Sequence, residues 1–169
     1  NTGFHAPTFN DLYWPLEVSA WGSYGGNPDL KPEKSRNVEA HLQYRTEHSR
    51  VRVTAFTNKI RNLIATNTVE TAPWFYETTT QNINRATIRG LTLAGEHDFG
   101  ATTLRASADF LDPRNDDPRP GEGSQLSRRA RQVFHLGVEH RIQAWKLGAE
   151  YQYTGNRYDD LANKTRLGG

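Results

Sequence analysis

Cysteine is absent from this chain of 169 residues. The absence excludes disulfide scaffolds, CxxC redox pairs and cysteine-ligated zinc, and it leaves the redox compartment undecided. Long apolar runs are absent as well: 35% of residues are hydrophobic and the mean hydropathy is -0.81. Since a membrane-spanning helix needs roughly 18 or more consecutive apolar residues, we expect no such helix.

The sequence also lacks a large excess of positive or negative charge. The 21 Lys and Arg residues against 19 Asp and Glu give a formal net charge of +2, which is too weak to indicate nucleic acid as a partner. The chain begins at Asn1 without an initiator Met, a basic segment or an apolar segment, so we expect no secretory signal. It has the character of a piece excised from a longer protein.

The sequence lacks the common catalytic motifs. GxSxG, HExxH, GxxxxGK[ST] and GxGxxG do not occur, and the six histidines are scattered rather than spaced as metal ligands. We therefore predict no enzyme, no catalytic residue and no metal site. A hydrolase built on a membrane barrel would need a Ser–His pair on one wall, and the candidate Ser107 belongs to a different expected hairpin from His135.

What the sequence does contain is alternation of apolar and polar residues with a period of two, typical of β-strands with two different faces. In the clearest run, Val38, Ala40, Leu42 and Tyr44 are interleaved with polar residues. The pattern predicts three hairpins, at residues 36–65, 83–111 and 128–155, and a further strand near residues 1–4. Short turns join the strands of each hairpin, whereas long loops are expected at 10–33, 66–81, 112–125 and 158–169.

Two architectures explain the alternation. One is a soluble antiparallel sandwich, in which the apolar face is a packed core; the other is a segment of an antiparallel transmembrane β-barrel, in which that face meets lipid. Strands of about 10 residues are long for a soluble sheet, whose mode is about 5–6, and the small residues on the apolar face suit a surface without a packed partner. The barrel interpretation requires four residues to face outward: Leu42, Leu104, Leu136 and Tyr151.

Several sequence motifs resemble those of a known protein family. The run GFHAPTFNDLYW at residues 3–14 and the run GNPDLKPEKS at residues 26–35 are similar to the C-terminal barrel half of TonB-dependent outer-membrane receptors. Three further segments have sequences that resemble the cobalamin-receptor branch: APTFNDLYWP (6–15), LSRRARQ (126–132) and YQYTGNRYD (151–159). The GNPDLKPE run is shared with siderophore receptors, so it indicates transport without indicating the cargo.

The resemblance implies an all-β fold, with residues 1–169 forming 6–7 strands, about strands 13 to 19, of a barrel of about 22 strands. It implies a receptor in the Gram-negative outer membrane, with its long loops extracellular, that imports cobalamin with energy relayed by TonB. Outer-membrane lipid and lipopolysaccharide would be partners, TonB would act through an N-terminal region outside this sequence, and no cofactor is expected because the family's Ca²⁺-binding loops lie outside this piece. The alternatives are a receptor for a siderophore or another nutrient, and a soluble antiparallel β binding module.

Aromatic residues in two of the expected loops are candidate ligand contacts, since amphipathic rings suit a large, partly apolar ligand. An interfacial aromatic belt is the alternative explanation. The candidates are Tyr13, Trp14, Trp21, Tyr24, Trp74 and Tyr76.

The resemblance also singles out Arg129, the second Arg of the RRA motif, as a ligand contact at the extracellular mouth; strand parity would place it on the same face as His135. The alternative is an arginine of the barrel wall paired with a carboxylate. Asn163 is a weaker candidate by the same resemblance. The acidic run from Asp112 to Asp117 offers oxygen ligands for Ca²⁺, but its spacing favours a solvated loop.

Overall fold

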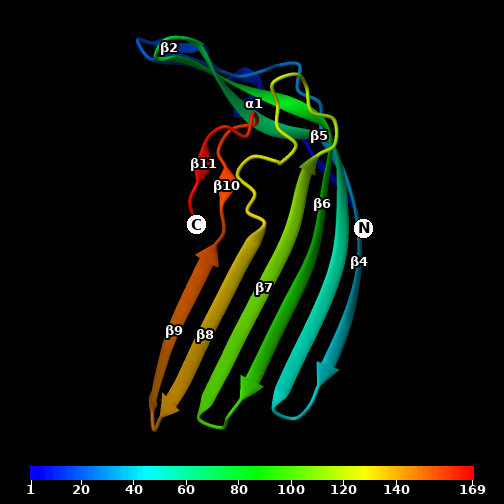
Figure 1. The fold of residues 1–169 in the computed structure, drawn as a ribbon, viewed down its shortest axis with the longest axis vertical. Coiled ribbons are helices and arrows are strands. Elements are labelled where there is room, and N and C mark those ends of the chain that lie inside the picture. Colours follow the sequence, from blue (N-terminus) through cyan, green and yellow to red (C-terminus); the bar gives the residue numbers. More distant parts are fainter.

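One large antiparallel sheet dominates the computed structural model, which describes residues 1–169 (Figure 1). Its main path runs in the order β1-β4-β5-β6-β7-β8-β9. The strands of this path are β1 (Thr2–His5), β4 (Glu33–Arg45), β5 (Ser49–Ala72), β6 (Phe75–Asp98), β7 (Thr102–Asn115), β8 (Gln132–Ile142) and β9 (Trp145–Thr154). The remaining elements are α1 (Phe9–Tyr13), β2 (Glu17–Ser19), β3 (Gly22–Gly25), β10 (Arg157–Tyr158) and β11 (Arg166–Leu167). Helix α1 is short, and the structure contains no helix long and apolar enough to cross a bilayer.

Tight turns join the strands at one end of the sheet, and the longer connections gather at the other (Figure 1). In the turn between β6 and β7, Gly100 has a φ of 86°, a conformation that glycine adopts without steric cost. The amide of Gly100 donates to Asp98 Oδ1 at 2.8 Å. Local turn chemistry therefore fixes the register of this hairpin.

The register aligns the alternating apolar side chains of neighbouring strands on one face. Leu42 lies opposite Val53 and Val53 opposite Leu93, and the row continues through Ala108, Phe134 and Tyr153. This face is uncovered: Leu42 is 77% exposed and Tyr151 is 63% exposed. A soluble sandwich would bury these residues against a second sheet, so the expected all-β barrel segment is confirmed and the sandwich is not the fold.

One expected loop is wrong. Residues 66–81 are strand, because β5 and β6 continue as a single hairpin of 24 residues per strand as far as the turn at Pro73 and Trp74. The polar composition of this segment suggested a loop, but threonine is β-branched and forms favourable cross-strand pairs. Thr68 and Thr78 are such a pair, with their hydroxyls 3.1 Å apart.

Smaller differences concern the ends of the strands. Strand β7 continues to Asn115, into the expected loop at 112–125, and β8 starts at Gln132 rather than at 128. The expected loop at 10–33 contains α1, β2 and β3, and the segment from 158 onward takes part in the small β10–β11 sheet. The three short-turn hairpins lie where the alternation predicts them.

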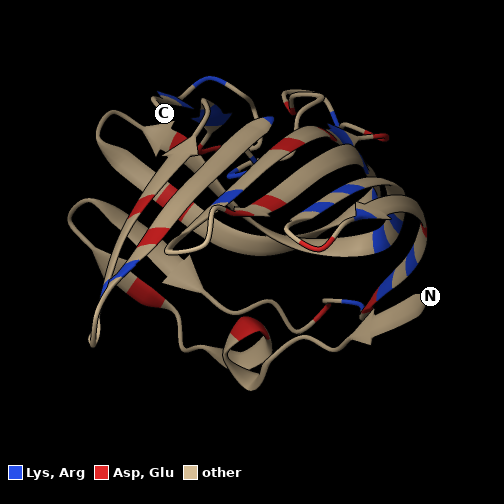
Figure 2. Ribbon diagram, turned by 90° about the horizontal axis from the view of Figure 1, so that it is seen from below, with Lys and Arg blue, Asp and Glu red and all other residues tan.

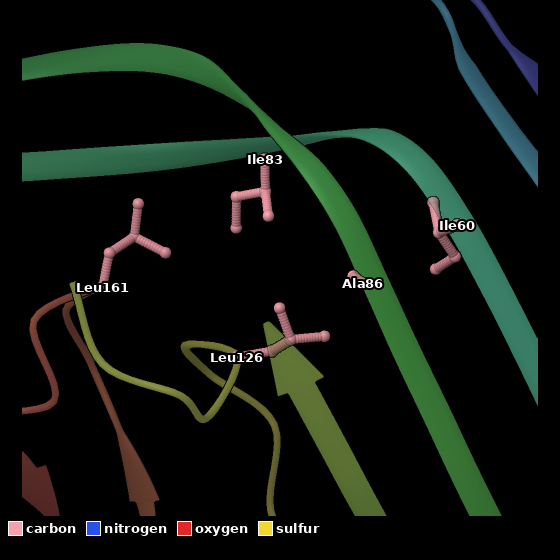
Figure 3. Packing of buried hydrophobic residues seen from close by; sticks show 5 residues of the cluster. All are labelled: Ile60, Ile83, Ala86, Leu126 and Leu161. Carbon is pink, nitrogen blue, oxygen red and sulfur yellow. The ribbon is translucent and has the colours of Figure 1, made fainter. Parts of the chain in front are cut away.

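The buried core is small and lies near the long-connection end of the sheet. Ile60, Ile83 and Ala86 of β5 and β6 pack against Leu126 and Leu161 from the connections (Figure 3). Asn62, with a φ of 55°, interrupts the alternation of β5 between Ile60 and Leu63, and both of these residues pack in the cluster. The core therefore anchors the connections to the polar face of the sheet.

Candidate ligand-binding site

Two segments far apart in the sequence fold against each other beside this core. Residues 123–130 follow β7, and residues 156–165 follow β9. The amide of Gly123 donates to the carbonyl of Leu161 at 2.6 Å, and Leu126 and Leu161 are each only 2% exposed. The tertiary packing thus converts two polar connections into one anchored unit, which we call the connection unit.

Arg128 and Arg129 belong to the connection unit and have different surroundings. Arg128, with a φ of 57°, pairs through Nε with Asp159 Oδ1 at 2.9 Å. The guanidinium of Arg129 forms no ion pair, and its backbone carbonyl accepts a hydrogen bond from Gln125 Nε2 at 3.1 Å. Arg129 is therefore the arginine of this motif whose charge remains free for a ligand.

The parity argument for Arg129 is wrong in its basis, because β8 begins only at Gln132 and the backbone before it is irregular. Arg129 instead lines a cavity of about 310 Å³ between the connection unit and the β5–β6 hairpin. Leu63, Ile83 and Leu126 line its apolar part, and Arg128 and Arg129 supply positive charge. Such a cavity is suited to a ligand that combines an apolar body with a polar or anionic group.

Asn163 holds the connection unit together through its own side chain. Its Oδ1 accepts from the amide of Gln125 at 3.0 Å, and its Nδ2 donates to the carbonyl of Gln125 at 2.9 Å. Its backbone has a φ of 56°, a left-handed conformation that asparagine tolerates better than most residues. Both polar atoms of this candidate ligand contact are thus already used within the protein.

The neighbouring Asp160 holds the same turn. Its carboxylate accepts from the amides of Lys164 at 3.1 Å and Thr165 at 2.6 Å. Partial burial acts to raise the pKa of Asp160, but the hydrogen bonds from Thr165 and Lys164 favour the charged form and hold that pKa below its ordinary value of 3.8. The ionised carboxylate therefore stabilises the turn that carries Asn163.

The aromatic candidates form a second group, brought together by a strand pairing. Strand β3 pairs in parallel with β6, with Gly22 opposite Tyr76, and the amide of Tyr76 donates to the carbonyl of Trp21 at 2.9 Å. Trp21 and Trp74 are each 71% exposed. The chain thus presents tryptophans from two distant segments at the same end of the sheet.

The other rings have partners within their own segment. The rings of Trp14 and Tyr24 are 6.2 Å apart, and Trp14 Nε1 donates to Glu17 Oε1 at 3.1 Å. Tyr13 packs 5.3 Å from Phe9. None of the six aromatic candidates lines the Arg129 cavity, so the structure presents two separate candidate surfaces.

A further cavity is lined by residues of β5 and β6, by part of segment 26–31 and by Arg119. Its volume is about 510 Å³, and no hydrophobic residue lines it. Asn82, one of the lining residues, accepts from the amide of Lys31 at 2.8 Å and donates to the carbonyl of Lys31 at 2.9 Å. Arg119, another lining residue, donates to Gln81 Oε1 at 3.0 Å. These partners are 38 to 51 residues apart, and no local sequence pattern links them.

The acidic segment is more ordered than a solvated loop. Asn115 is buried, and its Nδ2 donates to Glu122 Oε2 at 3.0 Å. Asp116 is the hydrogen-bond partner of Thr87, and Arg114 pairs with Asp112 at 2.7 Å. No group of three or more His, Cys, Asp or Glu side chains is placed to hold a metal ion.

Residues of both charge signs lie along the strands of the sheet (Figure 2). Arg105 Nε lies 2.8 Å from Glu96 Oε2, and Lys146 Nζ lies 2.8 Å from Glu139 Oε2. Glu96, Arg105 and Glu139 are among the residues that line a concavity of about 770 Å³. The register also sets Ser107 opposite His135. The two residues are therefore neighbours although they belong to different hairpins, but no hydrogen bond joins their side chains.

Known proteins share this sequence and fold. The family model for "TonB dependent receptor-like, beta-barrel" matches residues 1–169. The chain is 33% identical to the vitamin B12 transporter BtuB of Photobacterium profundum over 98% of its length, and 34% identical to BtuB of Vibrio vulnificus over 94%. It spans about a quarter of the length of these relatives, 25% and 23% respectively.

Solved structures agree on the fold. The copper transporter OprC superposes with a TM-score of 0.68 at 17% identity, covering 99% of this chain and 25% of OprC. The siderophore receptor PirA of Acinetobacter baumannii superposes with a TM-score of 0.64 at 17% identity, covering 99% of this chain and 26% of PirA. Together with the open, curved antiparallel sheet, the family match shows that this chain belongs to the TonB-dependent receptors and forms part of their β-barrel.

Proposed function

We propose that the protein containing this chain is an outer-membrane receptor that binds cobalamin and imports it with energy supplied through TonB. The observation that carries the cargo is the identity of 33% to a vitamin B12 transporter over nearly the whole chain. The fold likeness to copper and siderophore proteins supports the architecture alone, because their identity to this chain is only 17%.

The faces of the sheet support the location. The exposed apolar face is suited to contact with lipid, and the charged opposite face is suited to a wet interior. The long connections would face the outside of the cell and its lipopolysaccharide. Transport in this proposal consists of capture and gated release, with no covalent chemistry.

The proposed contacts are the two surfaces described above. Arg129 would interact with a polar or anionic group of the ligand, because its guanidinium has no internal ion-pair partner. The exposed rings of Trp21 and Trp74 would cover apolar parts of the ligand, with Tyr13, Trp14, Tyr24 and Tyr76 beside them. Both surfaces lie on the long-connection side of the sheet, as capture from outside requires.

The test is equilibrium binding of cyanocobalamin to the full-length receptor in detergent. We expect tight binding by the wild type and a loss of about 1 kcal/mol or more, roughly fivefold in affinity, for Arg129→Ala. A Trp14→Ala/Trp21→Ala pair tests the aromatic surface. Arg114→Ala is the matched control, since Arg114 is an exposed arginine whose partner, Asp112, lies two residues away.

The outcomes separate cargo from site. No binding of cyanocobalamin by the wild type would overturn the cobalamin assignment and direct the search to ferric siderophores and other nutrients. Tight wild-type binding that is equally strong in Arg129→Ala would keep the cargo and remove Arg129 from the site.

A further inference from the structure

We propose that Asn163 is a positioning residue: its amide clasps the backbone of Gln125 and thereby holds Arg129 at its cavity, instead of contacting the ligand itself. This inference rests on the proposed function and deepens it. It assigns different roles to two residues that the sequence alone would place together as ligand contacts.

The first argument is the geometry of the clasp. Oδ1 of Asn163 accepts from the amide of Gln125, and Nδ2 donates to the carbonyl of the same residue. The side-chain amide thus pairs with one residue in the way that a neighbouring strand would. With both its acceptor and its donor engaged, Asn163 has little hydrogen-bonding capacity left for a ligand.

The second argument is the path from Gln125 to Arg129. The side chain of Gln125, which is 7% exposed, turns back and donates from Nε2 to the carbonyl of Arg129. One residue therefore receives the clasp through its backbone and holds Arg129 through its side chain. Displacing the backbone of Gln125 would move the donor on which the Arg129 carbonyl depends.

The third argument is the close packing of the two segments at the clasp. A Cβ added at Gly123 would collide with the side chain of Asn163, so Gly123 is required for the close approach of the two segments. Leu126 and Leu161 then bury their side chains in the shared core (Figure 3). The clasp and the core lie side by side, which makes the position of residues 125–129 depend on residue 163.

Arg128 completes the division of roles. Its amide donates to the carbonyl of Tyr158 at 2.6 Å, and its guanidinium is paired with Asp159. Arg128 therefore fastens the connection unit from a second point, and the adjacent Arg129 stays free to interact with a ligand.

The experiment uses the full-length receptor and the variant Asn163→Gly. Glycine adopts the φ of 56° at this position without strain, so the variant removes the clasp and keeps the backbone conformation. Asn156→Gly is the matched control, because Asn156 is an exposed asparagine of the same segment whose side chain makes no hydrogen bond. Asn163→Asp is a second variant, which keeps the Oδ1 acceptor and loses the donor; it decides the question if Asn163→Gly fails to fold.

The first readout is amide hydrogen exchange of the ligand-free receptor. We expect peptides that contain Gln125 to exchange about tenfold faster or more in Asn163→Gly, consistent with the loss of two hydrogen bonds, and to be unchanged in Asn156→Gly. Unchanged exchange in Asn163→Gly, or in Asn163→Asp if the glycine variant does not fold, would overturn the clasp whatever the ligand is.

The second readout is a double-mutant cycle on cyanocobalamin binding. We expect Asn163→Gly to weaken binding severalfold in the wild type and to have no further effect in Arg129→Ala, because Asn163 acts through Arg129. Additive losses would show that Asn163 contacts the ligand independently and would overturn the positioning role. A wild-type receptor that does not bind cyanocobalamin would overturn the proposed function, and the exchange readout would still decide the clasp.

Discussion

Gly90 shows how a single residue shapes the polar face of the sheet. It lies between Phe56 on β5 and Leu111 on β7 in the cross-strand register. A Cβ at this position would lie 2.5 Å from Phe56 Cζ and 2.8 Å from Leu111 Cδ2. The absence of a side chain therefore lets the two neighbours close over the strand.

Gly90→Ala is expected to destabilise the receptor by about 1–3 kcal/mol, the usual effect of forcing an extra carbon into a packed position. The measurement is the midpoint of denaturant unfolding of the full-length receptor in lipid vesicles. Gly95→Ala is the matched control on the same strand, because a Cβ there would meet only the carbonyl of Arg50 at 3.9 Å. Equal midpoints for the two variants would contradict this account of Gly90.

Asp160 gives the connection unit a dependence on pH. Its pKa is lowered in the folded state, so its contribution to stability is fully present above the ordinary value of 3.8 and is lost as the pH falls through the lower folded value. We expect limited proteolysis of residues 156–165 in the full-length receptor to be constant from neutral pH down to about pH 5 and to accelerate below about pH 4.

The variant Asp160→Asn separates this effect from general acid unfolding. It removes the titrating group, so proteolysis of this segment should be faster than in the wild type at neutral pH and should change less on acidification. Acid-sensitive proteolysis of the same steepness in wild type and Asp160→Asn would assign the pH dependence to another group.

At the scale of the elements, alternation along a strand assigns each residue to one of two environments. Leu42 lies on the apolar face of β4, and His41 lies on the charged face. Because Leu42 is 77% exposed, an arginine at this position would cost little in water. In lipid the same substitution is expensive.

Leu42→Arg is therefore expected to destabilise the receptor in lipid vesicles by about 1–3 kcal/mol, because Leu42 lies near the end of β4 and the cost of a charge on the lipid face falls toward the interface. His41→Arg should change stability by less than about 1 kcal/mol. Denaturant unfolding of both variants of the full-length receptor in vesicles measures the difference. If the two substitutions had the same effect, the apolar face of β4 would not be the face that meets lipid.

At the scale of the whole molecule, the sheet is an arc with two open edges. Strand β9 pairs only with β8, and β1 pairs only with β4, so both outermost strands carry unpaired backbone groups. Within a bilayer each such group would cost several kcal/mol. The arc is therefore stable in lipid only as part of a closed barrel, consistent with a chain that spans a quarter of its relatives.

Much of this architecture follows from the sequence alone. The alternation from Val38 to Tyr44 predicts a strand and both of its faces, because the two-residue period is a local property of an extended chain. The same reasoning failed for residues 66–81, where polar side chains lie on both faces and no alternation marks the strand. The pairing of Thr68 with Thr78 depends on both halves of the hairpin, which are 10 residues apart at this pair.

For the candidate site, too, some features follow from the sequence and others only from the tertiary structure. The sequence by itself determined the strands that alternate, their apolar and charged faces and the family, because each depends on residues close together in the chain. Only the tertiary structure decided which arginine is free and what Asn163 does, because Arg128 meets Asp159 31 residues away and Asn163 meets Gln125 38 residues away. Contacts across such separations depend on how the sheet curves and where the connections pack, and no local pattern of residues encodes either.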